Sequence, residues 1–321
     1  MLELFKLVLS QRKCLDNWVS IIFQLLRIKY FHYPKLITLK KGKGKVSIRV
    51  FLTGHYYYFL KNCYEGKIKS FNIYDNAIEI NGKIAKIERN ELIGDYILAL
   101  LYNWEIRVGY FEKNGIKFTR LPLSVIEIFE NKDYEMEVKD REVVDIGANI
   151  GDSSIYFAIN GAKRVIAIEP LPSAYSELLK NIELNNLRNV IIPLNAAISS
   201  NEGEMEVPCN YEISDSITYS TFSKQENTNE ICKIPKITLK KILDYVKDPY
   251  LLKIDCEGCE FDLILNEYNN VSVFENIILE YHTIKTGIPY SSILNKLSSD
   301  YECKVIGSKK LGKMYCKKRR N

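Results

Sequence analysis

One stretch of this sequence, residues 143–170, constrains the fold more than any other. An apolar run is followed by a turn that contains Gly147 and Gly151, then by a helical run, and then by a second apolar run that ends at Glu169. Glycines let the backbone come close to a ligand, and a helix that starts there presents free N–H groups. The order predicts a strand, a tight turn, a helix and a second, parallel strand, with a nucleoside-cofactor site at the turn.

The spacing within this stretch distinguishes between cofactors. A dinucleotide fingerprint that starts at Gly147 needs glycine at positions 149 and 152, where the chain has Asn149 and Asp152. Asp145 suits a ligand with an ammonium group better than a pyrophosphate, because opposite charges attract. Glu169 is placed to accept hydrogen bonds from two ribose hydroxyls. The pattern therefore predicts S-adenosylmethionine; the alternative is a strand-to-helix turn that binds no ligand.

Motifs further along the chain extend this pattern. A third strand is predicted at 190–199, Lys253–Glu260 reads K-I-D-C-E-G-C-E, and Glu280–His282 reads E-Y-H. Over about residues 141–321 the chain resembles the FkbM family of methyltransferases, whose K-I-D-x-E-G-x-E and E-x-H segments recur here. The resemblance implies methyl transfer from S-adenosylmethionine. The residues that we predict at the cofactor are Asp145, Gly147, Asn149, Gly151, Glu169, Asn195 and Ala197.

The alternation of strands and helices sets the expected architecture. Residues 141–321 predict a doubly wound α/β domain with a mostly parallel seven-stranded sheet and a C-terminal antiparallel hairpin. Residues 46–140 predict a smaller β-rich domain, with hairpin turns at Asn81-Gly82 and Asn114-Gly115. Residues 1–45 predict a basic, helical segment that ends in a flexible linker at Lys40–Lys45.

Two residues are the candidates for catalysis. Asp255 and His282 fall at the carboxyl ends of consecutive predicted strands, where such sheets bind their ligands. We expect Asp255 to act as base, orienter or metal ligand, and His282 to act as general base because an ordinary histidine titrates near neutrality. The alternative for His282 is a structural hydrogen bond at the strand end.

Acidic residues crowd around these candidates. Glu257, Glu260 and Glu280 join Asp255 in a cluster whose oxygens suit a divalent cation. For Glu257 and Glu260 we favour a different role, which is to cap the helix that follows. No residue is predicted as a metal ligand on this basis.

The cysteines indicate the compartment. Eight cysteines are scattered along the chain, and the first residues lack a secretory signal, so we expect a reducing, cytoplasmic location. Cys256 and Cys259 are interpreted as small core residues rather than as a redox motif or half of a zinc site.

Charge is concentrated at the two ends. Residues 1–45 carry a net charge of +8 and residues 309–321 carry +7, so the body between them is acidic. Two solvated tails are the simpler interpretation; peripheral contact with an anionic membrane is the functional one. The uncharged run Asn17–Leu26 has ten residues, far short of the ~20 that span a bilayer.

The methyl acceptor is the part of the function that the sequence defines least. The motifs of base-modifying enzymes are absent at Asp255–Gly258, which disfavours a nucleic-acid substrate. We expect O-methylation of a small-molecule or glycan hydroxyl, with the Ser-, Thr- and Asn-rich stretch Asn210–Glu230 as the substrate loop. The alternatives are a cofactor-binding but inactive scaffold that docks to an anionic surface, and a nucleic-acid methyltransferase.

Overall fold

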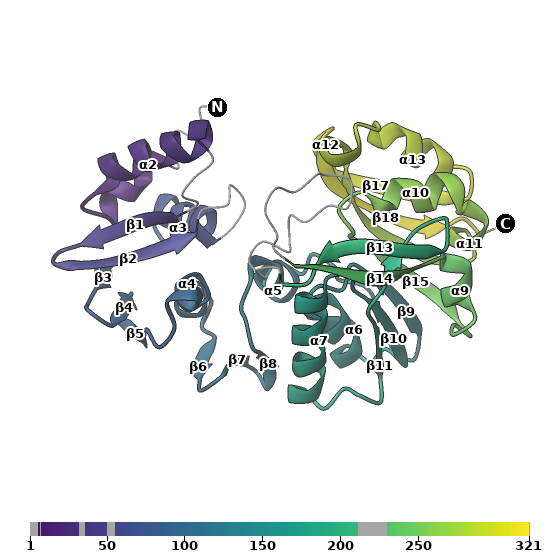
Figure 1. Cartoon of the computed structure of the whole chain (residues 1–321), viewed down its shortest axis with the longest axis horizontal. Coiled ribbons are helices and arrows are strands. Elements are labelled where there is room, and N and C mark those ends of the chain that lie inside the picture. The colour runs from purple at the N-terminus through teal and green to yellow at the C-terminus, as the bar shows by residue number, and fades with distance from the viewer. Residues whose placement is uncertain (1–5, 7, 32–35, 50–54, 211–229, 321) are drawn as a thin grey trace. The chain divides into compact units, whose positions relative to one another are not determined.

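The computed structural model describes residues 6, 8–31, 36–49, 55–210 and 230–320 (Figure 1). The chain divides into two compact units, Met1–Asn131 and Lys132–Asn321. Most of the expected substrate loop, residues 211–229, lies outside the described residues. In the part of the chain that the structure describes, no helix is long and apolar enough to cross a bilayer.

The first unit mixes short helices with three small antiparallel sheets. Its elements are η1 (Gln11–Lys13), α2 (Trp18–Phe31), β1 (Leu36–Lys41), β2 (Gly44–Arg49), α3 (His55–Tyr64), β3 (Phe71–Ile73), β4 (Ala77–Ile80), β5 (Lys83–Lys86), η2 (Asn90–Leu92), α4 (Ile93–Tyr102), β6 (Glu105–Arg107), β7 (Tyr110–Lys113), β8 (Ile116–Phe118) and α5 (Leu123–Phe129). The predicted hairpins at Asn81-Gly82 and Asn114-Gly115 are confirmed.

The predicted linker at Lys40–Lys45 is wrong, because these residues close a β-hairpin. Lys40 pairs with Lys45 across the hairpin, and Gly42 adopts the left-handed conformation at its turn. The carboxylate of Asp16 accepts a hydrogen bond from the Gly42 nitrogen at 2.6 Å. Glycine among lysines is typical of flexible segments, but the same glycine also supplies the positive φ that a two-residue turn requires.

The second unit is built around a seven-stranded sheet. Its elements are β9 (Glu142–Ile146), α6 (Asp152–Ile159), β10 (Arg164–Ile168), α7 (Pro172–Leu184), β11 (Ile191–Leu194), β12 (Ala197–Ile198), β13 (Gly203–Pro208), β14 (Ile231–Ile237), α9 (Leu239–Leu243), β15 (Pro249–Ile254), α10 (Cys259–Asn266), α11 (Tyr268–Val271), β16 (Asn276–His282), α12 (Thr283–Thr286), α13 (Tyr290–Leu297), β17 (Tyr301–Gly307) and β18 (Leu311–Lys318).

The strand order places the candidate site. The sheet runs β11-β10-β9-β15-β16-β18-β17, and its first five strands pair in parallel. β18 is antiparallel to both of its neighbours, so the predicted C-terminal hairpin is present. The strand order reverses between β9 and β15, and ligands of such sheets bind at the carboxyl ends beside this reversal.

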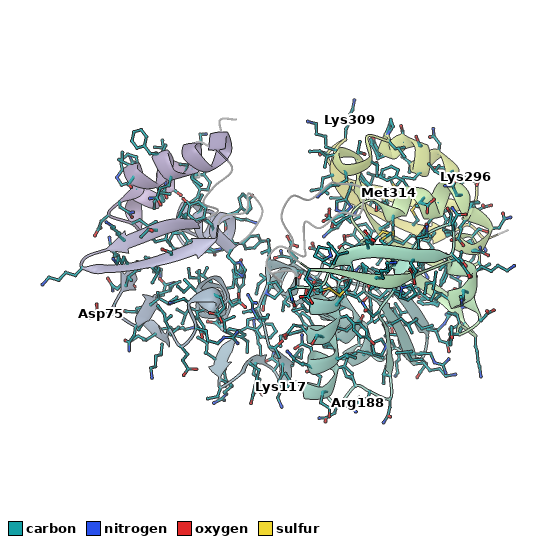
Figure 2. All side chains as sticks on the ribbon, viewed as in Figure 1. Asp75, Lys117, Arg188, Lys296, Lys309 and Met314 are labelled. Atoms are coloured by element: carbon teal, nitrogen blue, oxygen red, sulfur yellow. A yellow bond between two sulfur atoms is a disulfide. The ribbon has the colours of Figure 1, made fainter. Side chains whose placement is uncertain are left out.

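Alternate residues of the central strands face two different layers. In β9, Val144 and Ile146 join the apolar core that includes α9, α10 and α13. Asp145 lies between them and bonds instead to Ser153 and Ser154 of α6. Helices therefore cover both faces of the sheet, and its strands are buried on both sides. Met314 is buried within the unit, and Arg188 projects from its surface (Figure 2).

Six of the eight cysteines form disulfides, a pairing that the sequence analysis did not anticipate. Cys209–Cys232 connects the ends of β13 and β14, Cys303–Cys316 connects β17 to β18, and Cys256–Cys259 closes the turn before α10. Cys14 and Cys63 are the free cysteines of the described chain. Disulfides persist in oxidising environments, so these pairs remove the argument that the cysteines gave for a reducing compartment.

Candidate active site

The glycine loop after β9 depends on the absence of side chains. Gly147 has a φ of 77°, and a Cβ atom there would lie 1.8 Å from the carbonyl oxygen of Asp255. Gly151 has a φ of 90° at the start of α6, where a Cβ atom would lie 2.5 Å from Leu178 Cδ1. Glycine at both positions lets the ends of β9 and β15 come together and lets α7 pack against the loop.

Glu169 lies at the centre of the predicted cofactor residues. Its two carboxylate oxygens accept hydrogen bonds from the backbone nitrogens of Asn149 and Leu171, each at 2.8 Å. The side chain of Asn195 donates to the carbonyls of Glu169 and Pro170. Burial raises the pKa of Glu169 to about 7, although both backbone hydrogen bonds act to lower it. The structure therefore brings Asn149, Glu169 and Asn195 together.

A small cavity with apolar walls lies beside the glycine loop. Gly147 and Ala197, which were both predicted at the cofactor, are part of its wall. The lining also includes Ile146, Ile168, Pro170, Ala196, Ile198, Met205, Cys256 and Cys259. Apolar surface next to a glycine loop is the kind of wall that small-ligand sites use, but at about 30 Å³ this cavity is far smaller than a nucleoside.

Asp145 has a different partner from the one that we expected. Its fully buried carboxylate accepts hydrogen bonds from the hydroxyls of Ser153 and Ser154, and it lies 3.0 Å from Lys253 Nζ. Lys253 Nζ also donates to the carbonyl of Gly147 at 2.8 Å. The ammonium group beside Asp145 thus belongs to Lys253, and the pair supports the glycine loop from inside the sheet. A lysine within an apolar strand was the sequence signal for this pair.

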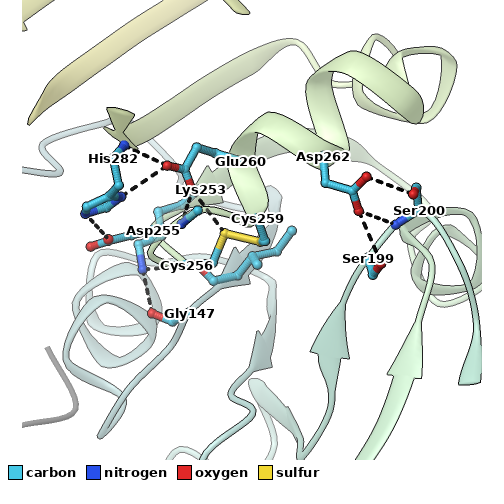
Figure 3. The surroundings of a disulfide bond; sticks show 12 residues. Gly147, Ser199, Ser200, Lys253, Asp255, Cys256, Cys259, Glu260, Asp262 and His282 are labelled. Carbon is cyan, nitrogen blue, oxygen red and sulfur yellow. Dashed lines mark hydrogen bonds and ion pairs between the residues drawn. A yellow bond between two sulfur atoms is a disulfide. The ribbon is translucent and has the colours of Figure 1, made fainter. Parts of the chain in front are cut away.

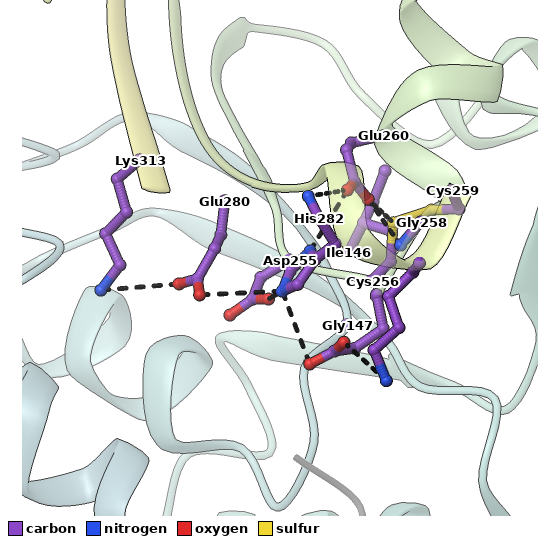
Figure 4. A network of polar contacts seen from close by, with 12 residues as sticks. Ile146, Gly147, Asp255, Cys256, Gly258, Cys259, Glu260, Glu280, His282 and Lys313 are labelled. Carbon is purple, nitrogen blue, oxygen red and sulfur yellow. Dashed lines mark hydrogen bonds and ion pairs between the residues drawn. A yellow bond between two sulfur atoms is a disulfide. The ribbon is translucent and has the colours of Figure 1, made fainter. Parts of the chain in front are cut away.

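At the ends of β15 and β16, the structure gathers carboxylates around His282 (Figure 4). The Nε2 atom of His282 lies 3.5 Å from Glu257, 3.7 Å from Glu280 and 4.0 Å from Asp255. Its Nδ1 atom lies 3.2 Å from Glu260. The strand-end prediction was thus correct in bringing Asp255 and His282 together.

The raised pKa of His282 favours a role other than the predicted general base. Burial alone would lower its pKa, but the hydrogen bond to Glu260 and the negative charges of Glu257, Glu260 and Asp255 raise it to about 10. A group with this pKa carries its proton at neutral pH and cannot accept another one. His282 is therefore an imidazolium that neutralises the surrounding carboxylates.

Asp255 is held in its ionised form. Burial raises its pKa, but Lys253, His282 and a hydrogen bond from Tyr134 lower it below the usual value. The Tyr134 hydroxyl donates to Asp255 Oδ2 at 2.8 Å. The Tyr134 ring also lies between two ammonium groups, those of Lys253 and Lys313. Sequence reasoning missed Tyr134, because it precedes the recognisable motifs.

Glu257 lies just before α10, and its side chain approaches the imidazole ring of His282. Its φ of 57° is left-handed, and its carboxylate faces His282. Burial raises its pKa to about 7, with the charges of Asp255 and Glu280 adding to the effect and those of His282 and Lys285 opposing it.

The acidic cluster also has the atom types of a cation site. Ligand atoms of Asp255, Glu280 and His282 lie within 4.8 Å of one another. In this structure positive charge comes from the protein itself, since Lys313 lies 3.6 Å from Glu280 and His282 carries a proton. A cation would have to replace the proton on His282, and we derive no step through a metal.

Comparison with protein families identifies the second unit. Residues 145–301 match the model of the methyltransferase FkbM domain. The chain contains a methyltransferase FkbM domain. This site is accordingly that of an S-adenosylmethionine-dependent methyltransferase, and the methyltransferase domain includes both the glycine loop and the acidic cluster.

Individual relatives of the methyltransferase domain are distant. "Methyltransferase 1" of Beauveria bassiana is 23% identical over 176 residues, which cover 48% of this chain and 70% of that protein. A putative rRNA methylase from Clostridium thermocellum covers 61% of this chain and 96% of its own, with 9% identity and a TM-score of 0.38. An O-methyltransferase from Bacillus cereus covers 56% of this chain and 74% of its own, with 13% identity and a TM-score of 0.34. Likeness at this level does not bear on the acceptor.

Proposed function

We propose that this methyltransferase transfers the methyl group of S-adenosylmethionine to a hydroxyl of a small-molecule or glycan acceptor. One observation carries the proposal: Glu257, with a pKa of about 7, lies 3.5 Å from His282 Nε2 in a cluster of charged side chains that includes ionised Asp255. A hydroxyl must lose its proton as it accepts a methyl group, and a base works best when its pKa lies near the working pH.

The cofactor assignment rests on the loop geometry. Gly147, Asn149 and Gly151 shape a backbone that a ligand can approach, and ionised Glu169 can accept two ribose hydroxyls. Asn195 and Ala197 complete this side of the site. Asp145 acts through Lys253, whose ammonium group holds the carbonyl of Gly147. When bound, the cofactor supplies an electrophilic methyl group.

We assign roles toward the acceptor to Asp255, Glu257 and His282 from the exposure and charge of their side chains. The side chain of Asp255 is 29% exposed and that of Glu257 is 16% exposed, so both can meet a substrate. Asp255 orients the hydroxyl, and Glu257 takes its proton. The His282 imidazolium, fixed by Glu260, keeps Asp255 ionised while Glu257 becomes neutral. His282 thus acts as a positioning charge.

A label-transfer screen tests this proposal. The full chain is incubated with methyl-labelled S-adenosylmethionine and separate pools of glycans, small alcohols and phenols, RNA, and amine-bearing compounds, and the products are analysed by mass spectrometry. We expect label on an oxygen of a glycan or small molecule, and its loss in Glu257→Gln. Label on RNA or on nitrogen would overturn the acceptor class. Cofactor binding without label in any pool would favour the inactive scaffold.

A further inference from the structure

The turn between β15 and α10 contains a disulfide that lies inside the active site (Figure 3). Cys256 and Cys259 both line the cavity that also includes Gly147 and Ala197. Cys256 is half-buried, whereas Cys259 is 8% exposed. The other two disulfides connect paired strands, at β13–β14 and β17–β18.

One buried carboxylate connects this turn to His282. Glu260 Oε2 lies 3.5 Å from Cys256 Sγ and accepts a hydrogen bond from the Gly258 nitrogen at 2.8 Å. Its other oxygen accepts a hydrogen bond from the His282 nitrogen at 2.7 Å. A movement of the turn therefore changes the position of the group that fixes the imidazolium.

The backbone conformation of the turn is restrained by the disulfide. Glu257 has a φ of 57°, which is unfavourable for a residue with a side chain, and Gly258 follows at 130°. Both residues lie inside the ring that the Cys256–Cys259 disulfide closes. In this conformation the Glu257 carboxylate lies 3.5 Å from His282 Nε2. The disulfide thus restrains the backbone that orients Glu257, the proposed base. Without the disulfide, the unfavourable φ of Glu257 can relax.

We propose that Cys256–Cys259 is a reversible thiol–disulfide site that controls methyl transfer. The disulfide form holds Glu257 and Glu260 against His282, and the dithiol form releases them. The effect on transfer rests on the proposed function, whereas the exchange chemistry does not.

The reaction partner is a dithiol. One thiolate of the dithiol attacks Sγ of Cys256, the more accessible sulfur; the S–S bond breaks, and Cys259 leaves as a thiolate that takes up a proton. The second thiolate of the dithiol then attacks the mixed disulfide and releases Cys256, which is protonated in turn. The dithiol is oxidised to a disulfide, the protein disulfide is reduced to two thiols, and two protons pass to the protein.

A first experiment counts thiols. The full chain is equilibrated in buffers of reduced and oxidised dithiothreitol in graded ratios, free thiols are alkylated, and peptides are quantified by mass spectrometry. We expect Cys256 and Cys259 to change state together, and to be reduced in buffers that leave Cys303–Cys316 intact, because Cys303–Cys316 joins directly paired residues of two sheet strands whereas Cys256–Cys259 closes a short turn. If Cys256 and Cys259 carry free thiols in every buffer, or stay joined when all other pairs have opened, the proposal is wrong.

A second experiment links the redox state to the site. Turnover and the His282 ring signals in NMR spectra, assigned with His282→Asn, are followed at fixed pH in oxidising and reducing buffers. We expect the wild type to lose about 10- to 100-fold in turnover on reduction, as for a misplaced catalytic group, and its His282 signals to shift. Cys256→Ala/Cys259→Ala should stay at the reduced level in both buffers.

The matched control removes a disulfide elsewhere in the same domain. Cys303→Ala/Cys316→Ala should respond to reduction as the wild type does. If the His282 signals stay unchanged while Cys256 and Cys259 change state, the proposal that this disulfide regulates the site is wrong. This readout needs no acceptor, so it stands even if no methyl transfer is found. The wild-type titration likewise decides the question if the Cys256→Ala/Cys259→Ala variant does not fold.

Discussion

Glu260 Oε1 lies 2.7 Å from the backbone nitrogen of His282 and 3.2 Å from its Nδ1 atom. This one oxygen holds both the strand end and the imidazole ring. Because Glu260 is fully buried, its charge acts on the ring with little screening by water. The hydrogen bond and the charge of Glu260 therefore both act to keep His282 protonated.

Replacing Glu260 should change the charge of His282. In Glu260→Gln the pKa of His282 should fall from about 10 by at least ~1 unit, since a hydrogen-bonded negative charge is removed. An NMR titration of the imidazole ring measures this change. Glu302→Gln, at an exposed position of β17, is the control and should leave the titration unchanged. An unaltered His282 titration in Glu260→Gln would mean that other carboxylates set the pKa.

Turnover should depend on pH in a bell-shaped manner. Glu257 accepts a proton only when ionised, so turnover should rise through about pH 7. His282 loses its proton near pH 10, and turnover should fall there. Glu257→Gln should abolish the acidic limb and lower turnover by ~10²–10⁴-fold, the usual contribution of a positioned base. Persistence of the acidic limb in that variant would assign it to another group.

Cofactor affinity should depend on Glu169. Its pKa of about 7 implies that the carboxylate accepts ribose hydroxyls only above that pH, so affinity should increase as the pH rises through about 7. Glu169→Gln should weaken S-adenosylhomocysteine binding by ~1–3 kcal/mol in calorimetric titration. The control is Glu183→Gln, at an exposed position of α7. Tighter binding of NAD than of S-adenosylhomocysteine would contradict the cofactor assignment.

The hydroxyl of Tyr134 should contribute to turnover through its hydrogen bond to Asp255. Tyr134→Phe keeps the ring beside Lys253 and Lys313 but removes the donor to Asp255. We expect turnover to fall by about tenfold, which corresponds to one hydrogen bond of ~1.4 kcal/mol to a charged group, with cofactor affinity unchanged. Tyr245→Phe, at an exposed position, is the control. A loss of cofactor binding in Tyr134→Phe would place the tyrosine on the donor side.

In the first unit, Asp95 should control acid stability. Its carboxylate is 1% exposed, lies 2.8 Å from Arg120 Nε and 3.2 Å from His55 Nε2, and has a pKa well below its usual value. Burial acts to raise that pKa, but the charge of Arg120 and the bonds to His55 outweigh it. The ionised carboxylate therefore contributes to the free energy of unfolding above the unfolded-state pKa of ~4. This contribution is progressively lost as the pH falls from there toward the pKa of the folded state.

The corresponding variant is Asp95→Asn. It should lower the free energy of unfolding of this unit by ~3–5 kcal/mol at neutral pH, because Arg120 is left without its charge partner. Urea unfolding, followed separately at pH 7 and pH 3, measures the effect, which should shrink at the lower pH. Equal effects at both values would show that the charge of Asp95 is not the cause.

Much of the second unit follows from local sequence. Continuous apolar runs predicted the central strands, and the glycines fixed the loop after β9, because both signals are contained in neighbouring residues. The first unit was less predictable. α3 (His55–Tyr64) is rich in tyrosine and phenylalanine, which favour strands, and only its packing as a helix overrides that preference. The basic ends remain a prediction of peripheral contact with anionic surfaces.

The site was predictable in its positions and not in its charges. The strand-end rule placed Asp255 and His282 together, since it needs only the order of elements. The protonation of His282 depends on Glu257 and Glu260, which lie 25 and 22 positions earlier in the chain and meet it only in the folded sheet. The pairing of Cys256 with Cys259 depends in the same way on the shape of the turn between them.

The approach of Gly147 to the carbonyl of Asp255 leaves no space between the donor and acceptor halves of the site. The two loops share a backbone contact, so a ligand that moves one of them must also move the other. Donor and acceptor should then bind with a mutual coupling free energy, equal in both directions by thermodynamic reciprocity. The order in which substrates are added during turnover would reflect that single contact.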